Sequence, residues 1–325
     1  MRQEMTPRTV ITGSIAILAA VVFVVVFWPY ATQDLMPSEI FRERTAEENA
    51  GRALYIANGC VYCHTQSIRS VDWGNGAERI AQAGDYVADR PILLGSQRTG
   101  VDLSQEGGVH PDDWHIAHFI NPRNTRPNSI MPPFEYLKMD RIKQLTRYVQ
   151  GLGGKGADSR MAHQDYWKTQ VIQAYEAGPV ENVKWLSDHV PEGWRIISNP
   201  YPTCVSGLAR GQKIYQDFCM GCHSPIGDGM GPAQPWIYPP PLNFTILKGR
   251  EISGGILYFQ IMNGIPGSAM PHFKAELESE KIWDVGNFVA VYFIDQSDAG
   301  KTRTSAVGDQ GSEFADKKQN ERLRP

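Results

Sequence analysis

A five-residue pattern, Cys-x-x-Cys-His, constrains this chain more than any other feature, and it occurs twice, at residues 60–64 and 219–223. Two thiols at this spacing can reach the two vinyl groups of one porphyrin, and the adjacent histidine then falls under the iron. Each motif therefore predicts one covalently attached haem c. The residues predicted to attach the haems and to supply the first axial ligands are Cys60, Cys63 and His64 in the first motif, and Cys219, Cys222 and His223 in the second.

Two other uses of paired cysteines fit less well. Zinc ribbons also contain two Cys-x-x-Cys pairs, but zinc does not need a histidine directly after each pair. A thioredoxin-like redox site belongs to a βαβ setting, and both pairs here follow helical patterns. Haem attachment is the interpretation that uses all five positions of each motif.

The sequence around the motifs repeats as well. Residues 51–64 and 211–223 both begin with glycine, continue through an apolar residue followed by tyrosine, and end in the motif, with one residue of slippage. This predicts two related modules, and 325 residues leave room for two small domains. The expected divisions are a first cytochrome c domain at 38–153, a linker with some helix at 154–202, a second cytochrome c domain at 203–295 and a polar tail at 296–325.

Each module also offers a second axial ligand. A Met-Pro-x-Phe phrase occurs at 131–134 and again at 270–273, each in a loop before a closing helix. Methionine ligation raises the reduction potential of a haem relative to histidine, so we assign Met131 and Met270 as axial ligands. Histidines could replace them and give bis-histidine iron; the alternatives are His110, His115, His118 and His272. Arg69 and Arg98 could contact the haem propionates, because guanidinium matches carboxylate geometry; the alternative is that both are solvated surface residues.

The N-terminus predicts a membrane anchor. Residues 10–30 carry no charge, and about 20 apolar residues cross a bilayer as one helix. Trp28 and Tyr30 suit an interfacial belt, whereas Arg2 and Arg8 lie on the other side, which predicts a cytoplasmic N-terminus at residues 1–9. A cleaved signal peptide is the competing interpretation, but the apolar run is longer than the apolar region of a usual signal peptide. We expect a single-pass protein of the bacterial cell membrane with both haem domains on the outer side.

The remaining pattern predicts a mostly α-helical fold. Helices are expected at 38–58, at 111–120 with Asp112 or Asp113 as its cap, at 140–152, and from about Ser279 as the closing helix. Cys204 is the one cysteine outside the motifs, and we interpret it as a buried or partly buried thiol.

Composition excludes other classes of function. The net charge of −3 and a pI near 6.3 argue against nucleic-acid binding. No general base, nucleophile or open metal site stands out, so no catalytic residue is predicted. The expected role is electron transfer.

Several phrases of the first domain resemble a known family. They are residues 60–69, 98–103, 112–118, 121–123 and 129–132. Together they resemble the membrane-anchored mono-haem subunit of cbb-type cytochrome c oxidases. The resemblance implies thioether bonds at Cys60 and Cys63, axial ligation by His64 and Met131, and a haem-copper catalytic subunit as partner. Val101 stands where that family usually has proline, and its backbone carbonyl would still reach the haem histidine.

The second domain departs from that family, whose members normally carry one haem. It is similar to generic class I cytochromes c and to domains of the dihaem subunit of the same oxidases, which suggests a fusion. The chain is thus expected to pass electrons from a soluble cytochrome c or other donor through two haems to a b-haem subunit that reduces dioxygen. The alternatives are the cytochrome subunit of a nitric oxide reductase, a stand-alone membrane-tethered shuttle and a peroxidase-like haem enzyme with five-coordinate iron.

Overall fold

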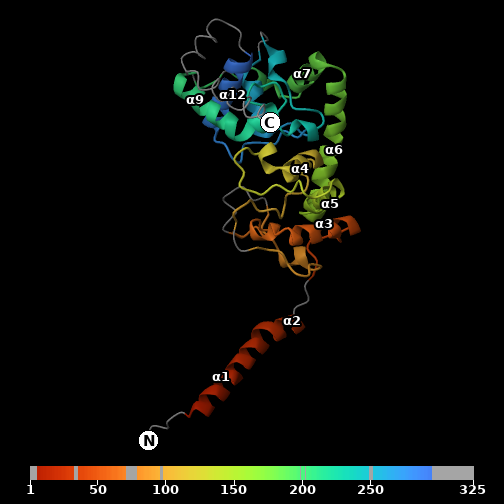
Figure 1. Cartoon of the computed structure of the whole chain (residues 1–325), viewed down its shortest axis with the longest axis vertical. Coiled ribbons are helices and arrows are strands. Elements are labelled where there is room, and N and C mark those ends of the chain that lie inside the picture. Colours follow the sequence, from red (N-terminus) through yellow and green to blue (C-terminus); the bar gives the residue numbers. More distant parts are fainter. Residues whose placement is uncertain are drawn as a thin grey trace, which may run out of the picture.

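The computed structural model describes residues 6–32, 36–70, 79–95, 98–197, 199–201, 203–248 and 252–294. Regular structure in these residues is helical, and no strand occurs among them. An N-terminal helix projects from one end of the molecule, and two helical domains follow along the long axis (Figure 1). The mostly α prediction is confirmed. The predicted polar tail at 296–325 lies outside the described residues.

The anchor is a continuous 26-residue helix, Pro7–Thr32, long and apolar enough to cross a membrane. It consists of α1 (Pro7–Val22), a π-helical turn at Phe23–Phe27 and α2 (Trp28–Thr32). The Thr6 side chain caps its first turn by accepting from the amide of Thr9. At 1.5 Å per residue the helix is about 39 Å long, which exceeds a hydrocarbon core of about 30 Å. No residue of α1 is buried against the rest of the chain.

The first domain contains three main helices: α3 (Ala46–Ala57), α4 (Asp112–Ile120) and α5 (Met139–Gln150). The helix predicted at 38–58 is shorter than expected. It begins at Ala46 because Thr45 and Glu48 form a reciprocal capping box, which fixes the first turn there. The predicted caps of α4 are also wrong, since Pro111 occupies the N-cap and makes no side-chain cap bond.

The second domain contains α9 (Val205–Ile214), a π-helical turn at Tyr215–Cys219, α10 (Met220–His223), α11 (Gly254–Asn263) and α12 (Ser279–Val289). The closing helix begins at Ser279, as the sequence predicts. The interpretation of Cys204 as buried or partly buried is wrong. Cys204 is exposed at the N-cap of α9, where its sulfur accepts from the amide of Gly207 at 3.4 Å, in the position that serine usually takes.

The same close helix crossing occurs in both domains. α3 packs on α5, and α9 packs on α12. A β-carbon on Gly51 would lie 2.0 Å from the Gln144 carbonyl oxygen, and one on Gly211 would lie 2.2 Å from that of Asp284. Glycine therefore allows backbone-to-backbone contact at both crossings. The repeat of glycine seen in the sequence corresponds to a repeated packing contact.

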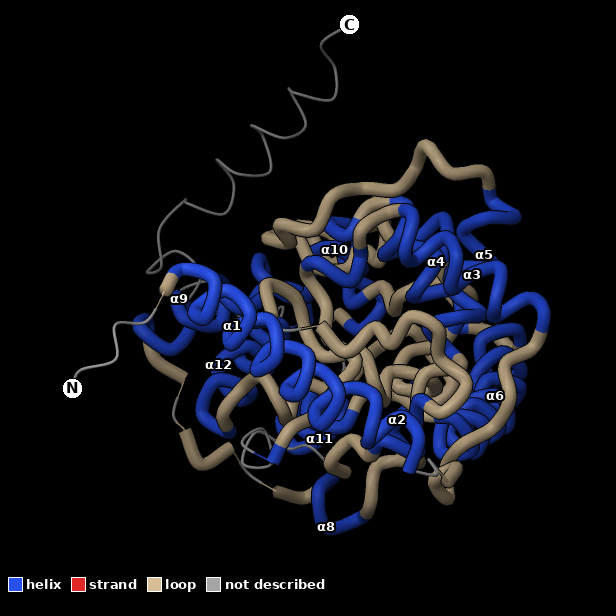
Figure 2. Tube along the Cα trace, turned by 90° about the horizontal axis from the view of Figure 1, so that it is seen from below, coloured by secondary structure: helices blue, strands red, loops and turns tan. Residues whose placement is uncertain are grey.

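Residues 154–202, predicted as a linker with some helix, are mostly helical. They form α6 (Gly154–Glu176), α7 (Pro179–Asp188) and the short α8 (Glu192–Arg195). α6 runs along one side of the molecule (Figures 1 and 2), and Figure 1 shows it passing from α5 toward α7. Arg160 of α6 donates to the carbonyl of Gly107 at 2.7 Å, and the Gln164 side-chain oxygen accepts from the amide of Gly267 at 2.7 Å. One helix thus holds both domains.

The domains also contact each other directly. A buried apolar cluster joins Trp114 and Ala117 of α4 to residues of the second domain, namely Ala233, Ile237 and Ala269, with Cys222 packed at its edge. We call this set the interdomain cluster. It places the second Cys-x-x-Cys-His motif against α4.

Polar contacts surround the interdomain cluster. Arg126 forms a two-fold ion pair with Glu276, with nitrogen-to-oxygen distances of 2.7 and 2.5 Å. Its guanidinium also lies over the rings of Phe218 and Phe273. A β-carbon on Gly221, between the two cysteines, would lie 2.3 Å from the Asn124 carbonyl oxygen. The first domain therefore fits against the motif at backbone distance.

Candidate haem sites

The first motif follows directly from the end of α3. Gly59 takes a left-handed conformation (φ 71°), and the chain then turns through a 3-10 segment at Cys60–Tyr62. The amides of Cys63 and His64 donate to the carbonyl of Cys60 at 3.2 and 2.9 Å. The second motif instead continues α9 through the π-helical turn into α10. This difference accounts for the one-residue slippage between the two sequence repeats.

Residues 98–103 hold the His64 side chain in place. Its Nδ1 lies 2.9 Å from the carbonyl oxygen of Val101, so the imidazole donates there and Nε2 remains for the iron. A β-carbon on Gly100 would come within 2.4 Å of Cε1 of the imidazole, so the glycine makes room for the ring. Valine in place of the usual proline leaves this hydrogen bond intact.

Asp102 fixes that segment. Its carboxylate accepts from the Thr65 hydroxyl at 2.5 Å and from the amide of Ser67 at 2.8 Å. It also accepts from the amide and hydroxyl of Ser104 at 2.9 and 2.5 Å. These bonds tie the residues after His64 to the residues that supply its hydrogen-bond acceptor. Asp102 is a positioning residue that sequence reasoning did not identify.

The second histidine makes the same kind of hydrogen bond through Nδ1. Nδ1 of His223 lies 3.1 Å from the carbonyl oxygen of Leu242, in the proline-rich loop. Phe244 stacks on the imidazole with ring centroids 4.4 Å apart. Desolvation lowers the pKa of His223 to about 4, so the ring is neutral at pH 7, the form in which histidine binds a metal.

The environment of the cysteines argues against the alternative uses of the motif. Desolvation by burial raises the pKa values of Cys219 and Cys222 to about 12 and that of Cys60 to about 11. Redox-active and nucleophilic cysteines have lowered pKa values in electropositive surroundings. These thiols lie in apolar walls, as covalent attachment to a buried group requires.

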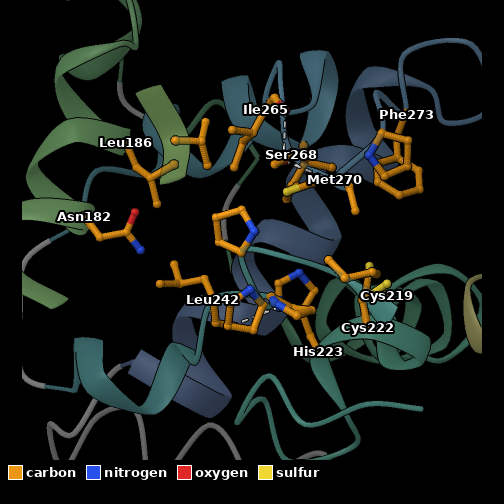
Figure 3. Close-up of a pocket in the computed structure, with 18 of the residues that line it drawn as sticks. Asn182, Leu186, Cys219, Cys222, His223, Leu242, Ile265, Ser268, Met270 and Phe273 are labelled. Carbon is orange, nitrogen blue, oxygen red and sulfur yellow. Dashed lines mark hydrogen bonds between the residues drawn. The ribbon is translucent and has the colours of Figure 1, made fainter. Parts of the chain in front are cut away.

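A large pocket lies between the second motif and the Met270 loop. It contains about 840 Å³ of space, part of it open to solvent. His223 and Met270 lie on opposite sides, and both cysteines lie near His223 (Figure 3). Most of the lining is apolar, including Phe218, Ile265 and Phe273. A flat macrocycle with two axial positions fits this arrangement of ligands and walls.

The linker supplies part of this pocket. Val171 of α6 and Asn182 and Leu186 of α7 line it together with the second domain. Figure 3 shows Asn182 and Leu186 on the side of the pocket away from the two cysteines. This role was not predictable from the sequence, because residues 154–202 carry no motif and reach the pocket only through the fold.

The two methionine loops share their local geometry. The amide of Met131 donates to the hydroxyl of Ser129 at 3.2 Å, and that of Met270 donates to Ser268 at 3.1 Å. The amide of the phenylalanine three residues later donates to a helix carbonyl in both domains, in α4 and in α11, at 2.9 and 3.1 Å. Met131 packs at the edge of the first apolar core, as does Cys60. The repeated phrase is therefore Ser-x-Met-Pro-x-Phe.

Two of the four alternative histidines, His118 and His110, have hydrogen-bond partners other than an iron. His118 Nδ1 lies 2.6 Å from the hydroxyl of Thr125, and His110 Nδ1 lies 2.6 Å from a carboxylate oxygen of Glu106. Among the residues that line the second pocket, none is a histidine other than His223. We therefore keep the methionines as the proposed ligands.

The two arginines remain predictions as propionate contacts. Arg98 donates to the Thr65 hydroxyl at 2.7 Å and to the Ser67 carbonyl at 2.8 Å, which keeps it beside the histidine segment. Arg69 lies just before residues 71–78, which are outside the described residues.

Comparison with known proteins tests the family assignment. The model of the family described as "Cytochrome C oxidase, mono-heme subunit/FixO" matches residues 3–171, more than half of the chain. A second model, "Cytochrome C oxidase, cbb3-type, subunit III", matches residues 206–289. No curated protein matches the chain.

One matching solved structure is the Kuenenia stuttgartiensis reducing HAO-like protein complex Kustc0457/Kustc0458. It is 19% identical, and the match covers 78% of this chain and 98% of that chain with a TM-score of 0.27. A similarity at that level carries no argument about fold or function.

The family matches confirm the resemblance seen in the sequence. Cytochrome c domains bind haem c covalently, and a FixO subunit works with a catalytic membrane subunit. The apolar helix at Pro7–Thr32 is the candidate membrane anchor. The chain belongs to the FixO family of cytochrome c oxidase subunits and is an electron-transfer subunit of a cbb3-type oxidase that carries a second cytochrome c domain.

Proposed function

We propose that this chain carries two haems c and passes electrons from a soluble cytochrome c or other donor to a b-haem catalytic subunit that reduces dioxygen. One observation carries the proposal: both domains present the same set of groups in the same order. Each has two cysteines, a histidine bonded through Nδ1 to a backbone carbonyl, and a methionine whose amide is held by a serine hydroxyl. Bound haem supplies a one-electron iron couple whose potential depends on its axial ligands.

The proposed roles of the residues follow from this set. Covalent attachment is assigned to Cys60, Cys63, Cys219 and Cys222. Axial ligation is assigned to His64 with Met131 and to His223 with Met270. The carbonyl partner of each Nδ1 selects the tautomer and makes the ring a stronger donor to iron. No residue on this chain is assigned to bond-making chemistry, so the catalytic centre belongs to the partner subunit.

We further propose an order of transfer, from donor to second domain, then first domain, then partner. One chain connection and one packing contact support this order of transfer. The anchor leads into the first domain, which keeps that domain closest to the membrane. Cys222 packs against the interdomain cluster, which brings the attachment edge of the second site close to α4. With Arg8 just before the anchor, the positive-inside rule places the N-terminus in the cytoplasm and both domains outside.

The test is a pyridine haemochrome assay on the complex, purified in mild detergent through a tag on this chain. Two haems c per chain together with haem b would support the dihaem subunit of a haem-copper complex. Two haems c without haem b, at unchanged recovery, would instead favour a tethered shuttle. One haem c would refute the assignment of one site per domain.

Turnover then identifies the terminal reaction. The proposal expects the purified complex to consume dioxygen with a reduced cytochrome c as donor. Reduction of nitric oxide without oxygen consumption would assign the chain to a nitric oxide reductase. Carbon monoxide binding to the reduced haem c of the unmodified chain would reveal an open iron position and favour the peroxidase-like alternative.

A further inference from the structure

A cluster of metal-binding side chains in the first domain lies apart from the pocket of the second haem site. Glu106 and His110 precede α4, and His115 lies in its first turn. An Oε1 of Glu106 lies 2.6 Å from Nδ1 of His110 and 3.7 Å from Nε2 of His115. One ligand atom from each of the three residues falls within 4.8 Å of the others. None of the three lines the pocket of the second domain.

The second observation is an unsatisfied nitrogen in this cluster. His115 is 2% exposed, and its Nε2 has no hydrogen-bond partner among the described residues. It faces the Glu106 carboxylate at a distance that is too long for a hydrogen bond. Burying a polar atom without a partner is unfavourable, so native proteins seldom leave one unsatisfied. A bound cation would satisfy this nitrogen and the carboxylate together.

We propose that Glu106, His110 and His115 bind a divalent transition metal, with Zn²⁺ the best fit. Two imidazoles and one carboxylate are a recurrent three-residue zinc set, with water as the fourth ligand. Ca²⁺ and Mg²⁺ prefer sites built entirely from oxygen, so the two imidazoles disfavour them. Zinc bonds of about 2.0–2.2 Å in a tetrahedron require donor atoms about 3.3–3.6 Å apart. The observed separations of 2.6 and 3.7 Å lie on either side of that range.

The surroundings suit a structural site. The Glu106 and His110 side chains are 12% and 14% exposed, so a metal could enter from solvent and still be mostly enclosed. His110 stacks on Trp114 with ring centroids 3.8 Å apart. Trp114 belongs to the interdomain cluster, so a metal here would fix the residue that connects α4 to the second domain.

The experiment measures zinc in the intact, haem-loaded complex. After treatment with a chelator and dialysis, Zn²⁺ is titrated by calorimetry, and its coordination is examined by X-ray absorption at the zinc edge. We expect the chelator-treated protein to bind one zinc ion per chain, with two imidazoles coordinated to the metal. Glu106→Gln keeps the shape of the side chain but removes its charge. It should weaken binding by at least the roughly 10- to 100-fold that loss of an outer-shell partner costs.

His163→Asn is the matched control, because His163 lies exposed on α6 and outside the cluster. It should bind zinc as the unmodified chain does, whereas His110→Asn should lose the same zinc as Glu106→Gln. Unchanged haem spectra would show that each variant is folded. Equal zinc binding by the unmodified chain and Glu106→Gln would overturn the proposal. Because the readout is zinc, this result is independent of haem content and oxygen turnover.

Discussion

Substitution of Gly211 by alanine tests the repeated helix crossing. The new β-carbon would lie 2.2 Å from the Asp284 carbonyl oxygen and 2.9 Å from the β-carbon of Phe288. Ordinary carbon-to-oxygen contacts are at about 3.3–3.6 Å, so α9 and α12 must separate by roughly 1 Å. Overpacking of this kind costs about 1–3 kcal/mol. Alanine has a higher helix propensity than glycine, which stabilises the variant by up to about 1 kcal/mol. The central expectation is therefore that the free energy of unfolding falls by roughly 1–2 kcal/mol.

The control is Gly193→Ala. Gly193 also lies in a helix, α8, but a β-carbon there would meet nothing within 4 Å. The propensity gain alone then applies, and this variant should be neutral or slightly more stable.

The assay is thermal unfolding of the haem-loaded chain, followed through the methionine-to-iron absorbance band. For a domain of 60–100 residues, 1 kcal/mol shifts Tm by about 4–8 °C. Gly211→Ala should therefore lower the Tm of the second domain by about 4–16 °C, with no comparable change for Gly193→Ala. Equal Tm values for the two variants would refute the inference that glycine is needed for the crossing.

Three other outcomes are expected. Met270→Ala should remove one methionine-to-iron band and allow the reduced protein to bind carbon monoxide; unchanged spectra would remove Met270 from the proposed ligands. Arg126→Ala should lower Tm modestly, because its partly exposed ion pair with Glu276 contributes about 0–1 kcal/mol and a cation–π contact with Phe218 or Phe273 about 0.5–1 kcal/mol. Because these contacts link the two domains, the variant should also slow electron transfer between them in flash-photolysis measurements. Burial opposes ionisation of Glu48, but the hydrogen bonds from Arg42 and Thr45 and the charge of Arg42 together outweigh it, so the pKa of Glu48 lies below the usual 4.5. The stability that this carboxylate contributes is therefore present above pH 4.5. It is lost as the pH falls through the lower pKa that Glu48 has in the folded protein. Glu48→Gln should flatten this acid dependence in urea titrations at about pH 5 to pH 3.

The sequence predicted the parts of the site that depend on local spacing. Each Cys-x-x-Cys-His motif and each Met-Pro-x-Phe phrase implies its chemistry within a few residues, and the family matches agree with the resemblance of the first domain. The closing helix at Ser279 was also predictable, because its apolar residues recur at helical spacing.

Other features depend on contacts between distant residues. Asp102 holds the loop of His64 through Thr65 and Ser67, and nothing in its own neighbourhood indicates those partners. The start of α3 could have been found, since a threonine followed three residues later by glutamate is a capping-box signature. α6 was harder to predict, because it packs along two domains and so lacks a single apolar face.

The helix α6 and the interdomain cluster have a kinetic consequence. When two redox domains are separate proteins, the rate at which they react depends on their concentrations and on the salt that screens their charges. With a haem in each domain, as proposed, the redox partners here would be covalently joined and already docked, and transfer between them would be a first-order process. Diluting the protein or raising the ionic strength should slow only the encounter with the external donor. Because of the fusion, the only diffusional step left in the proposed electron path before the catalytic subunit is the encounter with the external donor.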